Sequence, residues 1–260
     1  MKVVAIVQAR LGSTRLPGKI MADLAGKPLL QRVLSRAQRA ATLECVAIAT
    51  TDRPADEAVA EFCRAAGILC FRGSENDVLD RYYGAARQFG ADIIVRLTSD
   101  CPLLDPAVID QTVSAFLAGA YDYVSNTLQL SFPDGLDTEV FSLAALEKAW
   151  REARLPSERE HVTAYIWKHP ELFRLGNVRH EPDYSHLRWT VDEPADLEFV
   201  RRVYHLLGAE AVFGMDEVLT LLQTHPELSA VNAQFERNEG YKKSLRADPA
   251  LADSQQGKRL

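Results

Sequence analysis

Short apolar runs alternate with amphipathic segments over the first 117 residues, and this alternation limits the possible folds more than any other feature of the chain. The runs are rich in β-branched residues, as buried parallel strands are, and stand at 3–7, 45–50, 68–71 and 93–97. The segments after them have apolar residues at helical spacing and predict helices at 28–40, 54–67, 75–88 and 105–117. The pattern predicts a Rossmann-like three-layer α/β/α fold with a mostly parallel sheet.

The loop after the first run, residues 8–19, combines two glycines with three cations. Glycine lets the backbone approach a ligand closely, and successive N–H groups can form a nest for an anion. Arginine and lysine side chains neutralise phosphate oxygens. A surface loop with solvated charges is the alternative, but the position directly after the first strand favours a triphosphate site. The residues predicted to bind the nucleotide there are Ala9, Arg10, Gly12, Ser13, Arg15 and Lys19.

The distribution of charge supports a small anionic ligand. Residues 1–40 hold eight Lys or Arg and one acid, whereas the whole chain carries a net charge of −6. A cationic pocket in an acidic protein fits a small anion better than a nucleic acid. No apolar run is long enough to cross a membrane, and the four cysteines have no metal-type spacing. We therefore expect a cytoplasmic protein with reduced thiols that binds neither nucleic acid nor membrane.

Two acidic residues are candidates for a metal site. Asp100 follows the fourth predicted strand, and a carboxylate beside a phosphate loop suits Mg²⁺, which prefers carboxylate, phosphate and water oxygens. A cap or turn is the alternative for Asp100, although Asp105 is better placed to cap the next helix. Asp192 precedes a predicted helix at 196–207, so on its own sequence it suits a metal ligand and an N-cap equally.

Several polar residues of the second half are candidates for binding a sugar. Asp134, Asp137 and Glu139 alternate along one stretch, where they either accept bonds from sugar hydroxyls or form a solvated turn. His161 lies in a helix predicted at 158–167 with a Ser157/Glu160 capping box, and it either contacts ligand or is structural. Arg188 stands beside Trp189 and either shapes the sugar end or forms part of a buried pair.

The second half is less regular than the first. Strands are predicted at 123–125, 139–141 and 172–178, and further helices at 143–153 and 215–224. We expect one nucleotidyltransferase domain over 1–245, with a small sugar-site or dimerisation subdomain within about 123–190. Residues 246–260 are polar and predict a frayed tail.

Three stretches resemble the opening of the sugar-acid cytidylyltransferases, the Kdo (3-deoxy-manno-octulosonate) and sialate CMP-sugar synthetases. They are Ala9-Arg10, Ser13-Thr14-Arg15-Leu16-Pro17-Gly18-Lys19 and Leu24-Ala25-Gly26-Lys27-Pro28-Leu29. Two more, Gly135-Leu136-Asp137 and Arg159-Glu160-His161-Val162, resemble the branch named after spore-coat polysaccharide biosynthesis.

The resemblance implies a nucleotide-diphospho-sugar transferase fold, CTP and a sugar acid as substrates, and a homodimer. It also implies that Asp100 and Asp192 bind Mg²⁺ and that Arg72 helps to hold the nucleotide. Residues 73–83 depart from the Kdo pattern, which leaves the base and the sugar open.

The leading hypothesis is a Mg²⁺-dependent cytidylyltransferase of surface polysaccharide biosynthesis. A sugar hydroxyl attacks the α-phosphorus of CTP, pyrophosphate leaves, and Arg10, Lys19 and Asp100 are the catalytic residues. A nucleotide-sugar glycosyltransferase is one alternative, although the sequence after Asp100 lacks an Asp-x-Asp motif. A non-catalytic nucleotide-binding relative is the other.

Overall fold

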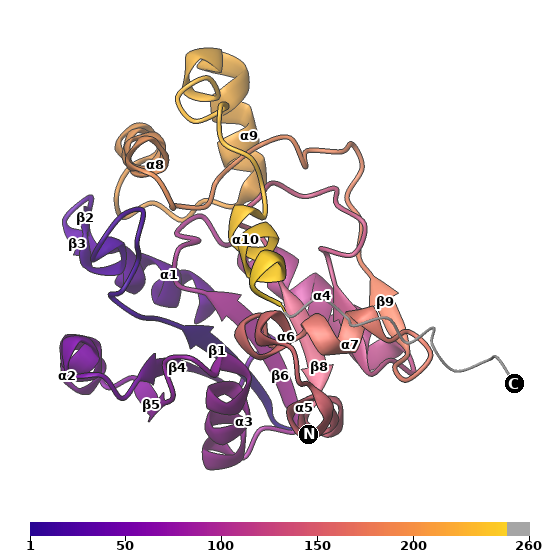
Figure 1. The fold of residues 1–260 in the computed structure, drawn as a ribbon. Coiled ribbons are helices and arrows are strands. Elements are labelled where there is room, and N and C mark those ends of the chain that lie inside the picture. Colours follow the sequence, from indigo (N-terminus) through magenta and orange to yellow (C-terminus); the bar gives the residue numbers. More distant parts are fainter. Residues whose placement is uncertain (249–260) are drawn as a thin grey trace, which may run out of the picture.

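A seven-stranded sheet forms the centre of the computed structural model, which describes residues 1–248 (Figure 1). In spatial order its strands are β5 (Leu69–Gly73), β4 (Cys45–Thr51), β1 (Val3–Gln8), β6 (Ile93–Thr98), β8 (Glu139–Ser142), β7 (Tyr123–Ser125) and β9 (Leu175–Asn177). Of these, β8 alone runs antiparallel to its neighbours. The predicted mostly parallel sheet is therefore confirmed, and the predicted strand at 172–178 is shorter than expected. A two-stranded hairpin of β2 (Asp23–Leu24) and β3 (Lys27–Pro28) stands apart.

Helices cover both faces of the sheet. One apolar core joins the sheet to α1 (Leu29–Ala37), α2 (Glu57–Ala66), α4 (Pro106–Ala118), α8 (Pro194–Leu207) and α9 (Met215–Thr224). A second core joins the opposite face to α3 (Val78–Phe89), α5 (Leu143–Glu152) and α7 (Ala164–Lys168). Successive residues of β1 alternate between the two cores, which is why that strand is apolar throughout. Among residues 1–248, no helix is long and apolar enough to span a membrane.

Most helix ends follow the capping residues that the sequence supplies. Asp105 accepts the Ala107 N–H at 2.8 Å to start α4, and Ser142 accepts the Ala145 N–H at 3.1 Å to start α5. The predicted helix at 75–88 begins later, at Val78, because the Asp77 carboxylate accepts the Asp80 N–H. The predicted helix at 54–67 starts as a 3₁₀ turn, η2 (Pro54–Asp56), before α2.

The predicted single helix at 158–167 is wrong. The structure has two short helices there, α6 (Pro156–Glu160) and α7, separated by Val162 at a left-handed φ of 49°. The expected Ser157/Glu160 capping box does not form, because both side chains bond to the C-terminal part of the chain. Ser157 donates to Asp248, and the Glu160 carboxylate accepts from Ser244.

A C-terminal helix, α10 (Glu239–Ala247), was not predicted, and it packs against α6 (Figure 1). The tail expected to fray at 246–260 therefore begins inside a helix, and its residues 249–260 lie outside the described part of the chain. The predicted 123–190 subdomain contributes β7, β8 and β9 to the main sheet.

Candidate active site

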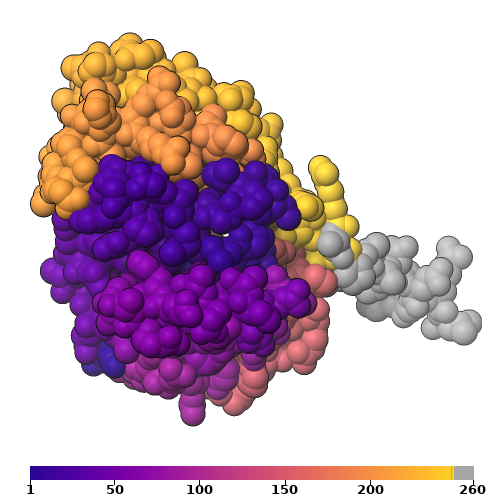
Figure 2. Space-filling model, turned by 90° about the vertical axis from the view of Figure 1, so that its left-hand side faces the viewer, coloured from indigo at the N-terminus to yellow at the C-terminus, as the bar shows by residue number. Residues whose placement is uncertain are grey.

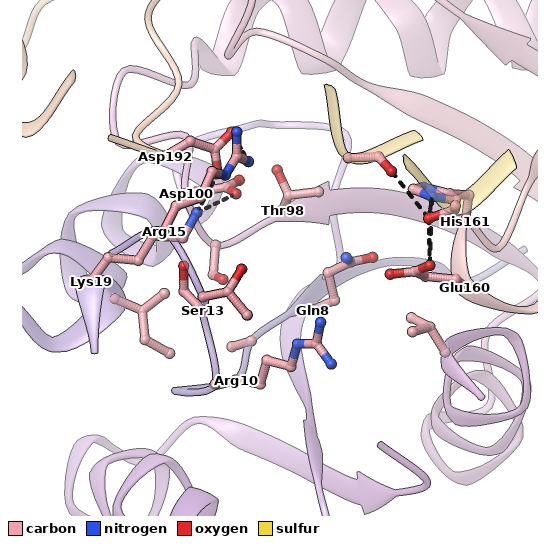
Figure 3. Close-up of a pocket in the computed structure, with 18 of the residues that line it drawn as sticks. Gln8, Arg10, Ser13, Arg15, Lys19, Thr98, Asp100, Glu160, His161 and Asp192 are labelled. Carbon is pink, nitrogen blue, oxygen red and sulfur yellow. Dashed lines mark hydrogen bonds and ion pairs between the residues drawn. The ribbon is translucent and has the colours of Figure 1, made fainter. Parts of the chain in front are cut away.

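A cavity of about 540 Å³ opens where β1 and β6 end, at the carboxyl edge of the sheet. Its walls come from segments that are far apart in sequence, and Figure 3 shows the principal side chains. In Figure 2 the N-terminal segment lies between the C-terminal segment above it and the residues coloured purple below it. The cavity is lined by Ala9, Arg10, Gly12, Ser13, Arg15, Lys19, Val78, Arg81, Thr98, Asp100, Glu160, His161, Asp192, Glu239, Lys243 and Ser244, among others.

The basic loop is held in place by its own backbone and by one distant carboxylate. The Leu11 N–H donates to Asp56 at 2.7 Å, and the Leu11 carbonyl accepts from the Gly18 N–H at 3.1 Å. Gly18 adopts a left-handed φ of 69°, which favours glycine. The loop is thus preorganised at the edge of the cavity, and all six of its predicted nucleotide-binding residues line that cavity.

Lys19 joins the two predicted metal ligands. Its ammonium lies 2.9 Å from an Asp100 oxygen and 2.8 Å from an Asp192 oxygen, and it also donates to the Val191 carbonyl at 2.8 Å (Figure 3). Burial disfavours the Asp100 carboxylate, but the charge and hydrogen bond of Lys19 outweigh burial and lower the pKa of Asp100 to about 2. Burial also disfavours the ammonium, yet the two carboxylates raise the pKa of Lys19 above its ordinary value. Asp100 and Lys19 are therefore both charged at neutral pH.

Arg15 is also paired with carboxylates. Its guanidinium lies 2.9 Å from the second oxygen of Asp192, 3.0 Å from Glu239 on α10, and 3.6 Å from Glu193. Arg10 has no such partner among residues 1–248, and its side chain points into the cavity (Figure 3). The loop therefore presents one uncompensated guanidinium and two cations that are already neutralised.

Asp192 is held in place by hydrogen bonds to its backbone. The buried Asp196 carboxylate accepts the N–H groups of Asp192 and Glu193 at 2.9 and 2.8 Å. Arg188 in turn holds Asp196 through two bonds of 2.9 Å. Glu193, not Asp192, occupies the N-cap of α8, so the N-cap alternative for Asp192 is wrong and its carboxylate faces the cavity. Arg188 does not line the cavity; its guanidinium lies 3.6 Å from Asp192 and also positions it through Asp196.

The acidic stretch predicted to bind sugar is not part of the cavity wall, and two of its acids are partly buried and paired with arginines. Asp134 and Asp137 pair with Arg237, and Arg188 lies 3.5 Å from Asp134. Burial and the negative charge of Asp137 raise the pKa of Asp134 to about 7. The solvated-turn alternative is wrong because the arginine partners come from distant segments.

Glu139 likewise lies in a network of side chains. Its carboxylate pairs with Arg96 on the neighbouring strand and accepts hydrogen bonds from the hydroxyls of Tyr123, at 2.7 Å, and Thr163. Glu139 is buried and does not line the cavity. A sugar-binding role for Asp134, Asp137 and Glu139 stays a prediction. In the structure Glu139 lies in a buried network, and Asp134 and Asp137 form partly buried ion pairs.

His161 does line the cavity, opposite the Lys19 cluster (Figure 3). Its Nε2 lies 2.9 Å from the Ser244 hydroxyl, and its ring packs edge-on against Tyr241, both on α10. Burial and the charge of Arg96 lower the pKa of His161 to about 4, so the imidazole is neutral at neutral pH.

Sequence reasoning missed α10, which adds Glu239, Gly240, Lys243 and Ser244 to the wall. The segment has few apolar residues, so periodicity gave little signal. The structure does not bring Arg72 to the cavity, since its guanidinium bonds to Glu57 and to the carbonyls of Thr51 and Arg53.

Comparison with known proteins decides the family. The cytidylyltransferase family model matches residues 4–230. The chain belongs to the cytidylyltransferase family. It is 35% identical to an uncharacterized protein of Methanocaldococcus jannaschii over 248 residues, which are 93% of this chain and 98% of that one. It is 33% identical to the spore coat polysaccharide biosynthesis protein SpsF of Bacillus subtilis over 235 residues, 86% and 95% of the two chains.

Other relatives of this cytidylyltransferase match over a shorter length or in fold. The 3-deoxy-manno-octulosonate cytidylyltransferase of Trichlorobacter lovleyi is 41% identical, but only over 118 residues, 45% of this chain and 46% of that one. A cytidylyltransferase structure from Leptospira borgpetersenii superposes with a TM-score of 0.85 at 36% identity, covering 91% of this chain and 99% of that one. A CMP-Kdo synthetase complexed with CTP shares the fold, with a TM-score of 0.62 at 21% identity over 79% and 99% of the chains.

The chemistry of Asp100 and Asp192 fits a divalent cation in this cytidylyltransferase. Both carboxylates converge on the single positive charge of Lys19, at the end of the basic loop. They are 25% and 21% exposed, so the cavity reaches their oxygens. Two carboxylates beside phosphate oxygens are the donors that Mg²⁺ prefers. The residues present are therefore able to hold the metal that the resemblance implies.

Proposed function

We propose that this nucleotidyltransferase transfers a cytidylyl group from CTP to a sugar acid, with Mg²⁺, and releases pyrophosphate. The observation that carries the proposal is the convergence of Lys19, Asp100 and Asp192 beside the loop of residues 9–18. A cavity of this size, with cations and carboxylates at one end and His161, Ser244 and Glu160 at the other, suits a nucleoside triphosphate and a second substrate.

Different residues of the chain bind the phosphate groups and neutralise their charge in this proposal. Arg10 and the loop amides bind phosphate oxygens and stabilise the pyrophosphate as the bond to the α-phosphorus breaks. Lys19 keeps Asp100 ionised and holds the Asp100 and Asp192 carboxylates in place. Asp100 and Asp192 would hold Mg²⁺ when it is bound, and the ion would supply neutralisation of phosphate charge and a lower pKa of the attacking hydroxyl.

The other end of the cavity is proposed to receive the sugar acid. His161 is neutral there, and its ring nitrogen and the Ser244 hydroxyl are able to bond to sugar hydroxyls. We infer that α10 therefore completes the acceptor site. From the likeness to SpsF we also propose a role in surface polysaccharide synthesis. We propose a homodimer from the resemblance to the CMP-sugar synthetases and a cytoplasmic location from the composition of the chain. Light scattering in solution measures the mass of the oligomer.

The direct test is an assay for pyrophosphate release. The protein is incubated with CTP, Mg²⁺ and a panel of nonulosonic and octulosonic acids, and we expect one of them to give pyrophosphate and a CMP-sugar in equal amounts. Sugar transfer from a nucleotide sugar without pyrophosphate would instead indicate a glycosyltransferase. CTP binding that is indifferent to Mg²⁺, with no turnover, would indicate a non-catalytic relative.

A matched pair of variants tests the metal assignment. Asp100→Asn keeps the size of the side chain but removes its charge, and we expect it to abolish turnover and to weaken the Mg²⁺ dependence of CTP binding. Asp216→Asn, an exposed acid on α9, is the control and should leave both unchanged. Full activity of Asp100→Asn would remove Asp100 from the site.

A further inference from the structure

We propose that Arg81 on α3 forms, together with Arg10, an anion subsite that binds a phosphate group of the nucleotide. No sequence motif pointed to Arg81, and it lies outside the basic loop. The proposal rests on the proposed function in one respect, namely that the anion belongs to a nucleotide.

Arg81 is a buried cation without a counter-ion. Its side chain is 2% exposed and lines the cavity one turn after Val78. One terminal nitrogen donates to the Ser74 carbonyl, and the guanidinium makes no ion pair with any carboxylate of residues 1–248. Its Nε is buried and has no acceptor in the same part of the chain. A buried charge in this condition is costly unless a ligand completes its bonds.

The other buried arginines of the described chain are better satisfied. Arg188 pairs with Asp196, and Arg96 pairs with Glu139. Arg36 lacks a carboxylate partner, but it donates to two backbone carbonyls and lies 4.5 Å from the centre of a phenylalanine ring. The incomplete bonding of Arg81 is thus not a general property of buried arginines in this protein.

Local packing sets the orientation of the Arg81 side chain. A Cβ at Gly73 would lie 3.3 Å from the Arg81 Cγ, so the glycine leaves room for the aliphatic stem. Burial lowers the pKa of Arg81, and the positive charge of Arg10 lowers it further. The negative charges of Asp56 and Glu75 raise this pKa but do not outweigh burial. Arg81 and Arg10 line one cavity and neither forms an ion pair with a carboxylate of residues 1–248, so an anion bound there would complete their bonds.

The nucleotide phosphates are the anion that these positions favour. Lys19 and Arg15 already pair with carboxylates, so Arg10 and Arg81 are the arginines of the cavity wall without an ion pair among the described residues, whereas Lys243 on α10 is exposed to solvent. Arginine suits phosphate because its planar fork donates two parallel bonds. A sugar-acid carboxylate and the carbonyl of the base are the other acceptors that the test must separate.

The test compares Arg81→Met with Arg87→Met. Methionine keeps an unbranched apolar stem, and Arg87 is an exposed arginine further along the same helix. Calorimetry measures the binding of CTP and of inorganic tripolyphosphate, which has no base. We expect Arg81→Met to weaken both by about 10- to 100-fold, which corresponds to about 1.4–2.8 kcal/mol. Arg87→Met should bind both as the wild type does.

The unfolding midpoint without ligand separates binding from folding. Because Arg81 is a buried charge without a counter-ion, Arg81→Met should be as stable as the wild type or more stable, while the increase in midpoint caused by CTP becomes smaller. Arg81→Lys keeps the charge and should recover part of the affinity.

Three results would overturn the inference. Unchanged affinity for both ligands would remove Arg81 from the phosphates and leave the sugar-acid carboxylate as its partner. Weakened CTP binding with normal tripolyphosphate binding would place Arg81 on the base. A large loss of ligand-free stability that Arg81→Lys restores without restoring affinity would make it structural. If the wild type binds tripolyphosphate through Arg81 but does not prefer CTP, the subsite stands and the proposed cytidylyl transfer fails.

Discussion

Replacing Lys19 by methionine perturbs the centre of the site. The Lys19 side chain is 8% exposed, and its ammonium holds Asp100 and Asp192 at 2.9 and 2.8 Å. Methionine keeps an unbranched stem but removes the charge. The two carboxylates are then left close together with no cation between them, although Arg15 still contacts the outer oxygen of Asp192.

The magnitude follows from the burial of the three groups. Breaking a buried ion pair by removing one partner costs about 3–5 kcal/mol. Water reaches about a quarter of the Asp100 side chain, which favours the lower end, about 3 kcal/mol. For a chain of this length such a loss lowers Tm by about 6–12 °C. Removing a cation from the site should also lower kcat by about 10²–10³.

The loss of stability caused by Lys19→Met should depend on pH. In the native protein the pKa of Asp100 is about 2, below its unfolded value, so this contribution to stability is present above about pH 4 and is lost as the pH falls to about 2. Without Lys19, burial and the charge of Asp192 should raise the pKa of Asp100 instead. The stability deficit of Lys19→Met should therefore be largest at pH 7 and shrink towards pH 5, and millimolar Mg²⁺ should reduce it.

Thermal and urea denaturation at pH 7 and pH 5, with and without Mg²⁺, measure these effects. Lys27→Met is the control, because Lys27 pairs with the exposed Glu210 on the surface and should cost less than about 1 kcal/mol. A Lys19→Met protein as stable as the wild type at pH 7, with an unchanged pH profile, would refute the reasoning.

Three further predictions concern neighbouring groups. Because the folded pKa of His161, about 4, lies below its unfolded value of about 6.5, the protein should lose at most about 3 kcal/mol as the pH falls from 6.5 to 4, and His161→Gln should flatten that slope in urea titrations. Arg188→Met should lower the free energy of unfolding, measured with urea, by about 3–5 kcal/mol, because it leaves the buried Asp196 carboxylate without its cation; a loss below about 1 kcal/mol would contradict the positioning role of Arg188. Glu239→Gln should tighten CTP binding by up to about fivefold in calorimetry, since it removes a negative charge that competes for the Arg15 guanidinium, and weaker binding would contradict this.

The local pattern of the sequence was enough to predict the first half of the fold and one wall of the site. Strand and helix periodicity, and caps such as Asp105, act over a few residues, so they can be read without knowing the tertiary structure. Because parallel strands end at one edge of a sheet, the loop after β1 and Asp100 after β6 were expected to lie together, and they do.

Tertiary structure decided everything that depends on pairing between distant segments. The sequence around Asp100 or Asp192 does not indicate that Lys19 lies between them, because this depends on how the start of α8 packs against the sheet. From the sequence, Asp134 and Asp137 either bind a ligand or are solvated, and only the tertiary structure shows that both pair with Arg237. The short polar helix α10 also lacked a local signal, because its place over the cavity is fixed by hydrogen bonds to α6 and His161 and not by an apolar stripe of its own.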